Sequence, residues 1–160
     1  MRFLSAPWRW KFISGAVKNK NCVFCDAQGK DFKESLVCYR GKKSFVILNK
    51  YPYNSGHLMV VPNQHVETPL KVDADVSEEM WQLMEKSITV LKNSFSPDGF
   101  NIGMNLGKAA GAGIKDHFHL HIVPRWQGDS NFMEIVGKTN VMSYDIGEIH
   151  EKLVMEFKKI

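Results

Sequence analysis

The sequence has little cysteine and no long apolar run. It contains three cysteines in 160 residues, an odd and low count that argues against a disulfide framework and favours a reducing compartment. Its longest purely apolar stretches are a few residues, as in Leu58–Pro62, which is too short for a transmembrane helix. The first residues, MRFLSAPWRWKF, lack the apolar run of a signal peptide. We therefore expect a cytoplasmic protein with no membrane partner.

The chain also lacks internal repeats, low-complexity tracts and any linker long enough to divide it. Its apolar content of 44% and its charged content of 24% are ordinary for a globular protein. The net charge of +4 suits a protein that handles phosphates, and we expect no nucleic-acid partner. We expect one domain over 1–160, with an aromatic and basic arm at 1–21, a core at 22–136 and a C-terminal extension with a helix at 137–160.

The periodicity of the apolar residues predicts strands followed by helices. Segments rich in β-branched and aromatic residues predict five strands, at Leu36–Arg40, Ser44–Leu48, His57–Pro62, Phe100–Asn105 and Phe118–Pro124. A spacing of three to four residues predicts a long helix with Ser77 as its N-cap, ended by Pro97-Asp98-Gly99, and a final helix capped by Asp145. Short connections favour antiparallel pairing, so the expected fold class is α+β.

Three histidines alternate with bulky apolar residues in the segment His117-Phe118-His119-Leu120-His121-Ile122-Val123. Because side chains alternate across a strand, the histidines should line one face while the apolar residues enter the core. Imidazoles packed side by side gain little burial and risk unpaired polar groups, which disfavours a purely structural role. A row of imidazoles can bind metal, attack phosphorus or move protons.

A Cys-x-x-Cys pair at Cys22 and Cys25 is ambiguous by itself. It can be a redox pair, half of a metal site or two packed thiols. The thioredoxin-like interpretation requires a βαβ context around the motif, which this chain does not show. A closed zinc site requires four ligands, so two distant histidines would have to complete it.

The segment 117–123 resembles, without a mismatch, the signature of the histidine-triad superfamily of nucleotidyl hydrolases and transferases. That signature is His-Φ-His-Φ-His-Φ-Φ, where Φ is apolar. The resemblance extends to Val46–Pro62 and to Asn105 with its glycine-rich loop. The segments Pro124–Met133 and Ala6–Arg9 resemble the diadenosine tetraphosphate phosphorylase (ATP adenylyltransferase) branch. The resemblance implies an antiparallel sheet with a central helix and a C-terminal helix packed against it, and a sheet continued across a homodimer.

The resemblance also assigns roles to individual residues. It implies that His119 attacks the α-phosphorus of a nucleoside polyphosphate, and that a neighbouring backbone carbonyl holds the second ring nitrogen of His119. It implies that His121 binds the phosphate and that Asn49 binds the ribose hydroxyls. The other implied substrate-binding residues are Asn105, Gly111 and Gly113 in the loop and Trp126 after the triad. Arg125 and Lys115 are candidate charge partners, and the role of His57 stays open.

A zinc site follows from the same resemblance. Related nucleotidyl transferases of the superfamily place zinc so that the next histidine but one is the nucleophile. The implied ligands here are Cys22, Cys25, His65 and His117. Such a site would fasten the N-terminal cysteines to the catalytic strand. Cys38, in a predicted strand, is expected to be a small core residue.

The expected activity is cleavage of diadenosine tetraphosphate through a covalent AMP-histidine, with orthophosphate as acceptor and ADP and ATP as products. Many triad hydrolases carry a glutamine or serine before the first histidine, where this chain has Gly111-Ala112-Gly113-Ile114. This bare loop favours phosphate over water as the acceptor. The alternatives are a hydrolase of dinucleoside polyphosphates or adenosine phosphoramidates, and a nucleotide-binding module without turnover.

Overall fold

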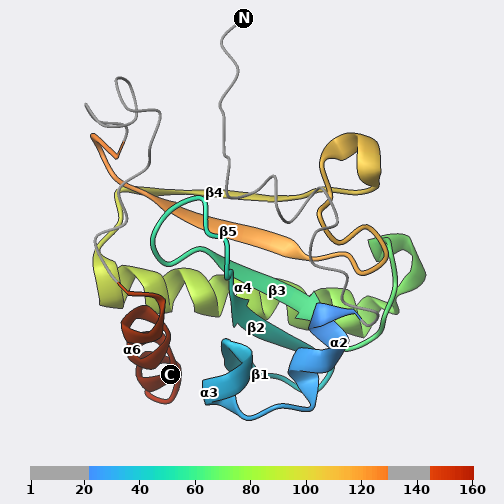
Figure 1. The fold of residues 1–160 in the computed structure, drawn as a ribbon, viewed down its shortest axis with the longest axis horizontal. Coiled ribbons are helices and arrows are strands. Elements are labelled where there is room, and N and C mark those ends of the chain that lie inside the picture. Colours follow the sequence, from blue (N-terminus) through green and yellow to red (C-terminus); the bar gives the residue numbers. More distant parts are fainter. Residues whose placement is uncertain (1–21, 130–144) are drawn as a thin grey trace, which may run out of the picture.

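Five antiparallel strands form a single sheet in the computed structural model, which describes residues 22–129 and 145–160 (Figure 1). The order across the sheet is β1-β2-β3-β5-β4, and each neighbouring pair is antiparallel. This arrangement confirms the α+β class. The predicted arm at 1–21 and the segment 130–144 lie outside the described residues. In chain order the strands are β1 (Val37–Arg40), β2 (Ser44–Leu48), β3 (Leu58–Pro62), β4 (Gly99–Met104) and β5 (Leu120–Arg125).

Two helices cover one face of this sheet. The long helix α4 (Ala74–Phe95) contacts β2, β3 and β5, and the C-terminal helix α6 (Ile146–Phe157) contacts α4 and β1 (Figure 1). Because apolar residues recur every three to four positions in α4 and α6, each helix turns one apolar stripe toward the sheet. The main core lies between these layers, and among its fully buried members are Val46, Leu58, Val60, Val90, Leu91, Ile122 and Leu153.

The helix ends test two predictions. The helix α4 begins at Ala74 with Asp73 as its N-cap, so the prediction of Ser77 as the N-cap is wrong. The first turn continues the apolar stripe, because Val76 is buried in the core, and this burial favours an additional helical turn before Ser77. The prediction for α6 is confirmed, since the Asp145 side chain accepts a hydrogen bond from the Gly147 N–H.

The opposite face of the sheet is covered by short elements. Helices α2 (Val23–Gln28) and α3 (Phe32–Ser35) precede β1, and a second apolar cluster there includes Phe24, Phe45 and Met59. The Arg40 guanidinium on β1 donates to the carbonyls of Ala27, Gln28 and Lys30. These bonds satisfy carbonyls at the end of α2 and hold that helix against the sheet.

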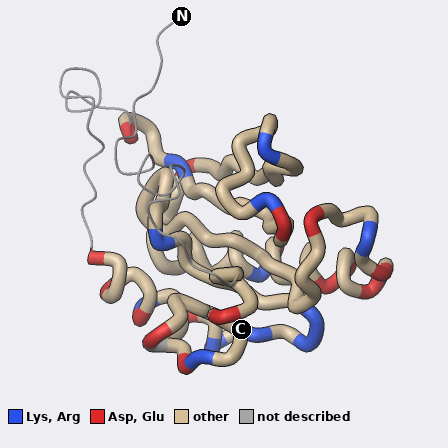
Figure 2. The backbone as a smooth tube through the Cα atoms, turned by 45° about the vertical axis from the view of Figure 1, so that its right-hand side comes forward, with Lys and Arg blue, Asp and Glu red and all other residues tan. Residues whose placement is uncertain are grey.

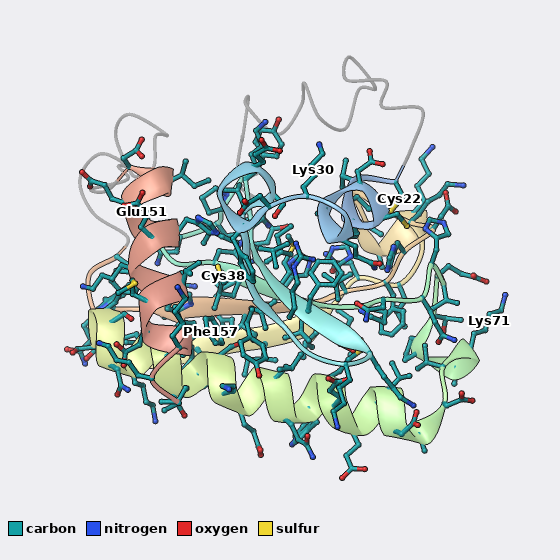
Figure 3. The ribbon with its side chains drawn as sticks, turned by 90° about the horizontal axis from the view of Figure 1, so that it is seen from below. Cys22, Lys30, Cys38, Lys71, Glu151 and Phe157 are labelled. Carbon is teal, nitrogen blue, oxygen red and sulfur yellow. The ribbon has the colours of Figure 1, made fainter. Side chains whose placement is uncertain are left out.

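Charged residues are interspersed around the described backbone (Figure 2). Among the described residues, no helix is both long and apolar enough to cross a membrane. Cys38 is buried in the main core, as predicted, and its burial raises the pKa of its thiol. Figure 3 shows Cys38 well separated from Cys22, which lies at the start of α2.

Candidate functional site

The three alternating histidines enter the site from the start of β5. The predicted strand began at Phe118, whereas β5 begins at Leu120, so His117 and His119 lie just before it. The alternation holds across this boundary, because Phe118, Leu120 and Ile122 all belong to the core under α4. The intervening histidines therefore face the other side of the sheet. The rings of His119 and His121 are 4.7 Å apart, centroid to centroid.

The hydrogen bonding of His119 determines which ring nitrogen can react. Its Nδ1 lies 3.0 Å from the carbonyl oxygen of His117, so the Nδ1–H donates to that carbonyl. The neutral ring then carries a lone pair on Nε2. The ring is 6% exposed, and burial lowers the pKa of His119 while the bond to the His117 carbonyl raises it. Burial has the larger effect, so the neutral form is favoured and Nε2 is suited to attack an electrophile.

A fourth histidine, His57, positions His121. His57 lies in the turn directly before β3, the strand that pairs with β5. The Nδ1 of His57 accepts a hydrogen bond of 3.1 Å from the Tyr53 N–H and lies 3.3 Å from the Asn49 amide nitrogen. The proton of a neutral His57 ring is therefore on Nε2, which lies 2.9 Å from His121 Nδ1. His121 accepts at Nδ1, so its own Nε2 carries a proton that can be donated to a phosphate oxygen.

His57 is the residue whose role the sequence left open. It is fully buried and stacks against Tyr53 with a centroid distance of 4.9 Å. The available signal was its place between Gly56 and Leu58 in the motif. That signal did not reveal the contact with His121, because the two residues are 64 positions apart in the chain.

Two cysteines and two histidines converge beside the triad. Their ligand atoms all lie within 4.8 Å of one another. Cys22 Sγ is 3.3 Å from His117 Nδ1, Cys25 Sγ is 3.3 Å from His65 Nδ1, and Cys25 Sγ is 3.7 Å from His117 Nδ1. These are the four residues that the resemblance implied as zinc ligands.

The cluster fits a tetrahedral zinc ion. Bond lengths for zinc with cysteine and histidine place neighbouring sulfur and nitrogen ligands about 3.5 Å apart, close to the separations here. Desolvation and the neighbouring Cys22 thiol raise the pKa of Cys25, and a divalent cation would reverse this by stabilising the thiolate. His117 Nε2 donates to the Pro62 carbonyl at 2.9 Å, which leaves Nδ1 unprotonated toward the cluster.

His117 connects the cluster to the ring of His119. Its Nδ1 faces the two cysteines, and its carbonyl oxygen accepts the hydrogen bond from His119. The ring of Phe24, from α2, contacts both imidazoles. Its centroid lies 5.4 Å from that of His117 and 4.9 Å from that of His119. A metal ion bound by this cluster would therefore fix the position of His117, whose backbone carbonyl orients the His119 ring.

The implied ribose ligand Asn49 already serves the turn before β3. Its Oδ1 accepts a hydrogen bond from the Tyr51 N–H, and its amide nitrogen faces His57. Asn105 follows β4 directly and lines a groove that also contains His121. The structure therefore brings both asparagines near the histidines. Asn105 shares a groove with His121, and the Asn49 amide contacts His57.

The glycine-rich loop folds back on itself. Residues 108–110 form a single 3-10 turn, η2 (Lys108–Ala110), after which Gly111 adopts φ +84°, a conformation that favours glycine. The Gly111 N–H donates to the Lys108 carbonyl, and the Ala112 N–H donates to the Gly107 carbonyl. These two amides are committed within the loop, so the loop that contains Gly111 and Gly113, the implied substrate-binding glycines, has fewer amides available for an anion.

The structure does not bring Trp126 to the histidines. Its indole Nε1 donates to the Phe95 carbonyl at the end of α4, and five extended residues place it roughly 16 Å from His121. Arg125 forms a bidentate ion pair with Asp129, and Lys115 pairs with the adjacent Asp116. The Trp126 ring thus caps the long helix.

A hollow on another part of the described surface lies apart from the histidines. It has a volume of about 630 Å³ between the β1–β2 turn and α4, and no histidine lines it. The Glu79 carboxylate there accepts the N–H groups of Lys42 and Lys43, and Lys43 also pairs with Asp75. Glu79, Lys43 and Asp75 thus form one set of polar contacts within this hollow.

Comparison with known proteins places this site in a family context. The family model described as the HIT domain matches residues 31–128. The AP-4-A phosphorylase of Mycobacterium tuberculosis is 42% identical over 127 residues, which are 79% of this chain and 65% of that protein. The bis(5'-adenosyl)-triphosphatase of Dictyostelium discoideum is 27% identical over 97 residues, which are 61% of this chain and 64% of that protein. The chain thus spans less than two thirds of the length of either relative.

A solved structure adds a comparison in three dimensions. The zinc-bound histidine triad family protein of Mycobacterium smegmatis superposes with a TM-score of 0.70 and 26% sequence identity. The match covers 88% of this chain and 95% of that protein. The sheet and helices described above are therefore those of an established fold.

Proposed function

This chain belongs to the HIT domain family, and from that membership we propose that it is a nucleotidyl transferase that cleaves diadenosine tetraphosphate or a related dinucleoside polyphosphate. The observation that carries this proposal is the buried His119 ring, whose Nδ1–H is held by the His117 carbonyl. The similarity to relatives named for diadenosine polyphosphates supports the substrate class.

The proposed first step is attack by His119 Nε2 on the α-phosphorus. A bond forms between that nitrogen and phosphorus, and the bond from phosphorus to the bridging oxygen of the leaving polyphosphate breaks. The product is AMP joined to His119, with ATP released when the substrate is diadenosine tetraphosphate. In the second step an oxygen of the acceptor displaces the histidine nitrogen, which regenerates the free ring.

His121 binds the phosphoryl group in this proposal. Its Nε2–H, set by the bond to His57, donates to a phosphoryl oxygen and stabilises the charge that develops there. The hydrogen bonds from Tyr53 and Asn49 to His57 keep that donor on the correct nitrogen, so no proton has to be redistributed before the reaction.

The acceptor distinguishes phosphorolysis from hydrolysis. We propose orthophosphate, because the stretch Gly111-Ala112-Gly113-Ile114, where many triad hydrolases carry a glutamine or serine, offers no side-chain hydrogen bonder to position water. With diadenosine tetraphosphate as substrate, we expect breakdown that depends on added phosphate and yields ADP and ATP in equal amounts. Product chromatography with and without phosphate measures this. ATP with AMP in the absence of phosphate would establish hydrolysis, for which the similarity to a triphosphatase is the supporting observation.

We also propose that Cys22, Cys25, His65 and His117 hold a structural zinc ion, supported by the fit of their spacing to tetrahedral geometry. Bound zinc would supply a fixed cross-link between the start of α2 and the segment before β5. The chain's own residues then keep the His117 carbonyl aligned with His119.

We also propose a homodimer, from the edge of the sheet that no other described strand covers. Strand β4 is an edge strand, and three large apolar side chains along or beside it, Ile102, Met104 and Leu106, are 43%, 40% and 44% exposed. No strand of the described part of the chain pairs with the outer side of β4, and such an edge with exposed apolar residues favours strand pairing with a second copy.

Sedimentation tests this pairing. We expect the wild-type protein to sediment at twice the 18.3 kDa chain mass, whereas Ile102→Glu should sediment as a monomer because it buries a charge at the paired edge. Leu70→Glu, at a 92% exposed position on the turn after β3, is the matched control and should remain dimeric. A monomeric wild-type protein would contradict the proposal.

Several expectations stay predictions. They are the single-domain organisation, the cytoplasmic location, the absence of nucleic-acid and membrane partners, and the substrate-binding roles of Asn49, Asn105, Gly111, Gly113 and Trp126.

A further inference from the structure

A groove on the site face of the sheet begins at His121 and runs along β4 and β5. It has a volume of about 400 Å³ and contains Gly103, Asn101 and Arg125. Tyr53, from the turn before β3, forms one wall, and its ring centroid is 6.0 Å from that of His121. The groove therefore adjoins the group that would bind the reacting phosphate.

Gly103 makes room for this groove. It lies directly across from His121 in the pairing of β4 with β5, so a side chain at 103 would stand beside the imidazole. A Cβ placed there would meet no described atom within 4 Å, and the backbone does not require glycine, because its φ lies outside the positive range. A glycine inside a strand often marks the close approach of a ligand.

The far end of the groove is polar and electrically balanced. Arg125 lies four positions after His121 along β5, a distance of roughly 13 Å. The Arg125 guanidinium donates to both carboxylate oxygens of Asp129 and to the Asn101 side-chain oxygen. These bonds hold the pKa of Asp129 below its usual range, so the ion pair is maintained at neutral pH.

This distribution of charge indicates what the groove can hold. The proton of His121 Nε2 at one end suits an anionic phosphate. The balanced ion pair and the amide of Asn101 at the other end suit a neutral group with several hydrogen-bonding atoms, such as a nucleoside. A polyphosphate followed by a nucleoside has this order of charges.

Building on the proposed function, we propose that this groove receives the leaving half of the dinucleoside polyphosphate, and that Gly103 makes the site selective for substrates with a large leaving group. The phosphate chain lies beside His121 and the glycine, and the second nucleoside lies toward Asn101 and Arg125. The first nucleotide, which is transferred to His119, does not occupy the groove.

Two substrates that differ only in their leaving groups test this. Diadenosine tetraphosphate releases ATP, whereas adenosine 5'-phosphoramidate releases ammonia, and both transfer the same AMP to His119. In Gly103→Leu, we expect kcat/KM for diadenosine tetraphosphate to fall by about 100-fold, because the leaving half is displaced from its productive position. For the phosphoramidate, we expect a change below about threefold, since its leaving group never enters the groove.

A second variant and a control make the outcome decisive. Asn101→Trp narrows the same groove from an exposed position. It should also lower kcat/KM for diadenosine tetraphosphate much more than kcat/KM for the phosphoramidate, even if Gly103→Leu fails to fold. Gly29→Ala, at the end of α2 where no described atom is within 4 Å of an added Cβ, should leave both substrates unaffected. Thermal unfolding of each variant measures its folding independently of activity.

The remaining outcomes overturn the proposal. Equal losses on both substrates would mean that Gly103 serves the fold or the transfer step itself. Unchanged activity on both would mean that the leaving half lies elsewhere. A wild-type protein that uses the phosphoramidate but not diadenosine tetraphosphate would refute the groove while leaving transfer to His119 intact, and one that uses neither would refute the proposed function as well.

Discussion

Replacement of His119 by alanine should reduce the turnover of diadenosine tetraphosphate by at least about 1000-fold, because it removes the atom that we propose attacks the α-phosphorus. The buried ring presents Nε2 as its lone-pair nitrogen, since Nδ1 donates to the His117 carbonyl. No other described histidine has this combination of a backbone-held Nδ1 and a place between two further histidines. Release of nucleotide from the substrate measures the loss.

The covalent intermediate gives a second measurement of the same prediction. Wild-type protein mixed with substrate in the absence of phosphate should gain the mass of one adenylyl group on the peptide that contains His119, and His119→Ala should gain none. His150→Gln is a matched control, because His150 lies on α6 and donates to the Val37 carbonyl outside the site. It should retain the adduct. An adduct on another residue, or full turnover by His119→Ala, would exclude His119 as the nucleophile.

Replacement of Cys22 by serine should lower zinc affinity by more than roughly 100-fold, because it removes a thiolate from the proposed four-ligand site. Wild-type protein should carry one zinc per chain, measured by elemental analysis after purification without chelator. At free zinc about 1000 times the dissociation constant, binding stabilises the folded state by roughly 4 kcal/mol. The variant should lose most of this, seen as a lower unfolding temperature in zinc-containing buffer.

Cys38→Ala separates the metal effect from a general effect on folding. Cys38 is buried in the main core and lies apart from the cluster (Figure 3). This variant should be less stable through lost packing, yet it should bind one zinc with unchanged affinity. Wild-type protein without zinc, or equal zinc content in Cys22→Ser, would refute the site.

Local pattern was sufficient for most of the sheet. Strand β2 is Ser44–Leu48 in both the prediction and the structure, and the other strands differ by one or two residues at their ends. β-branched and aromatic residues with short connections describe antiparallel strands well, because the relevant interactions are between near neighbours in sequence. The start of α4 was not predictable in this way, since the burial of Val76 depends on the sheet that the helix covers.

The candidate site residues also differ in whether local sequence or tertiary structure determines their position. The alternation of His117, His119 and His121 is a local property, so the sequence indicated which face of the strand carries the histidines. The position of Trp126 depends on the tertiary structure. Its proximity in sequence to the triad suggested a role near phosphate, which stays a prediction, and the fold places its indole at the end of α4, where Nε1 donates to the Phe95 carbonyl.

The sequence by itself determined the fold class, the row of histidines and the types of ligand available for a metal. These properties depend on residue type and on spacings of two to four positions. Only the tertiary structure brought Cys22 to His117 across 95 positions and His57 to His121 across 64. The proton positions on His119 and His121, and the opening at Gly103, depend on atoms contributed by distant segments. They exist only once β3, β4 and β5 are paired.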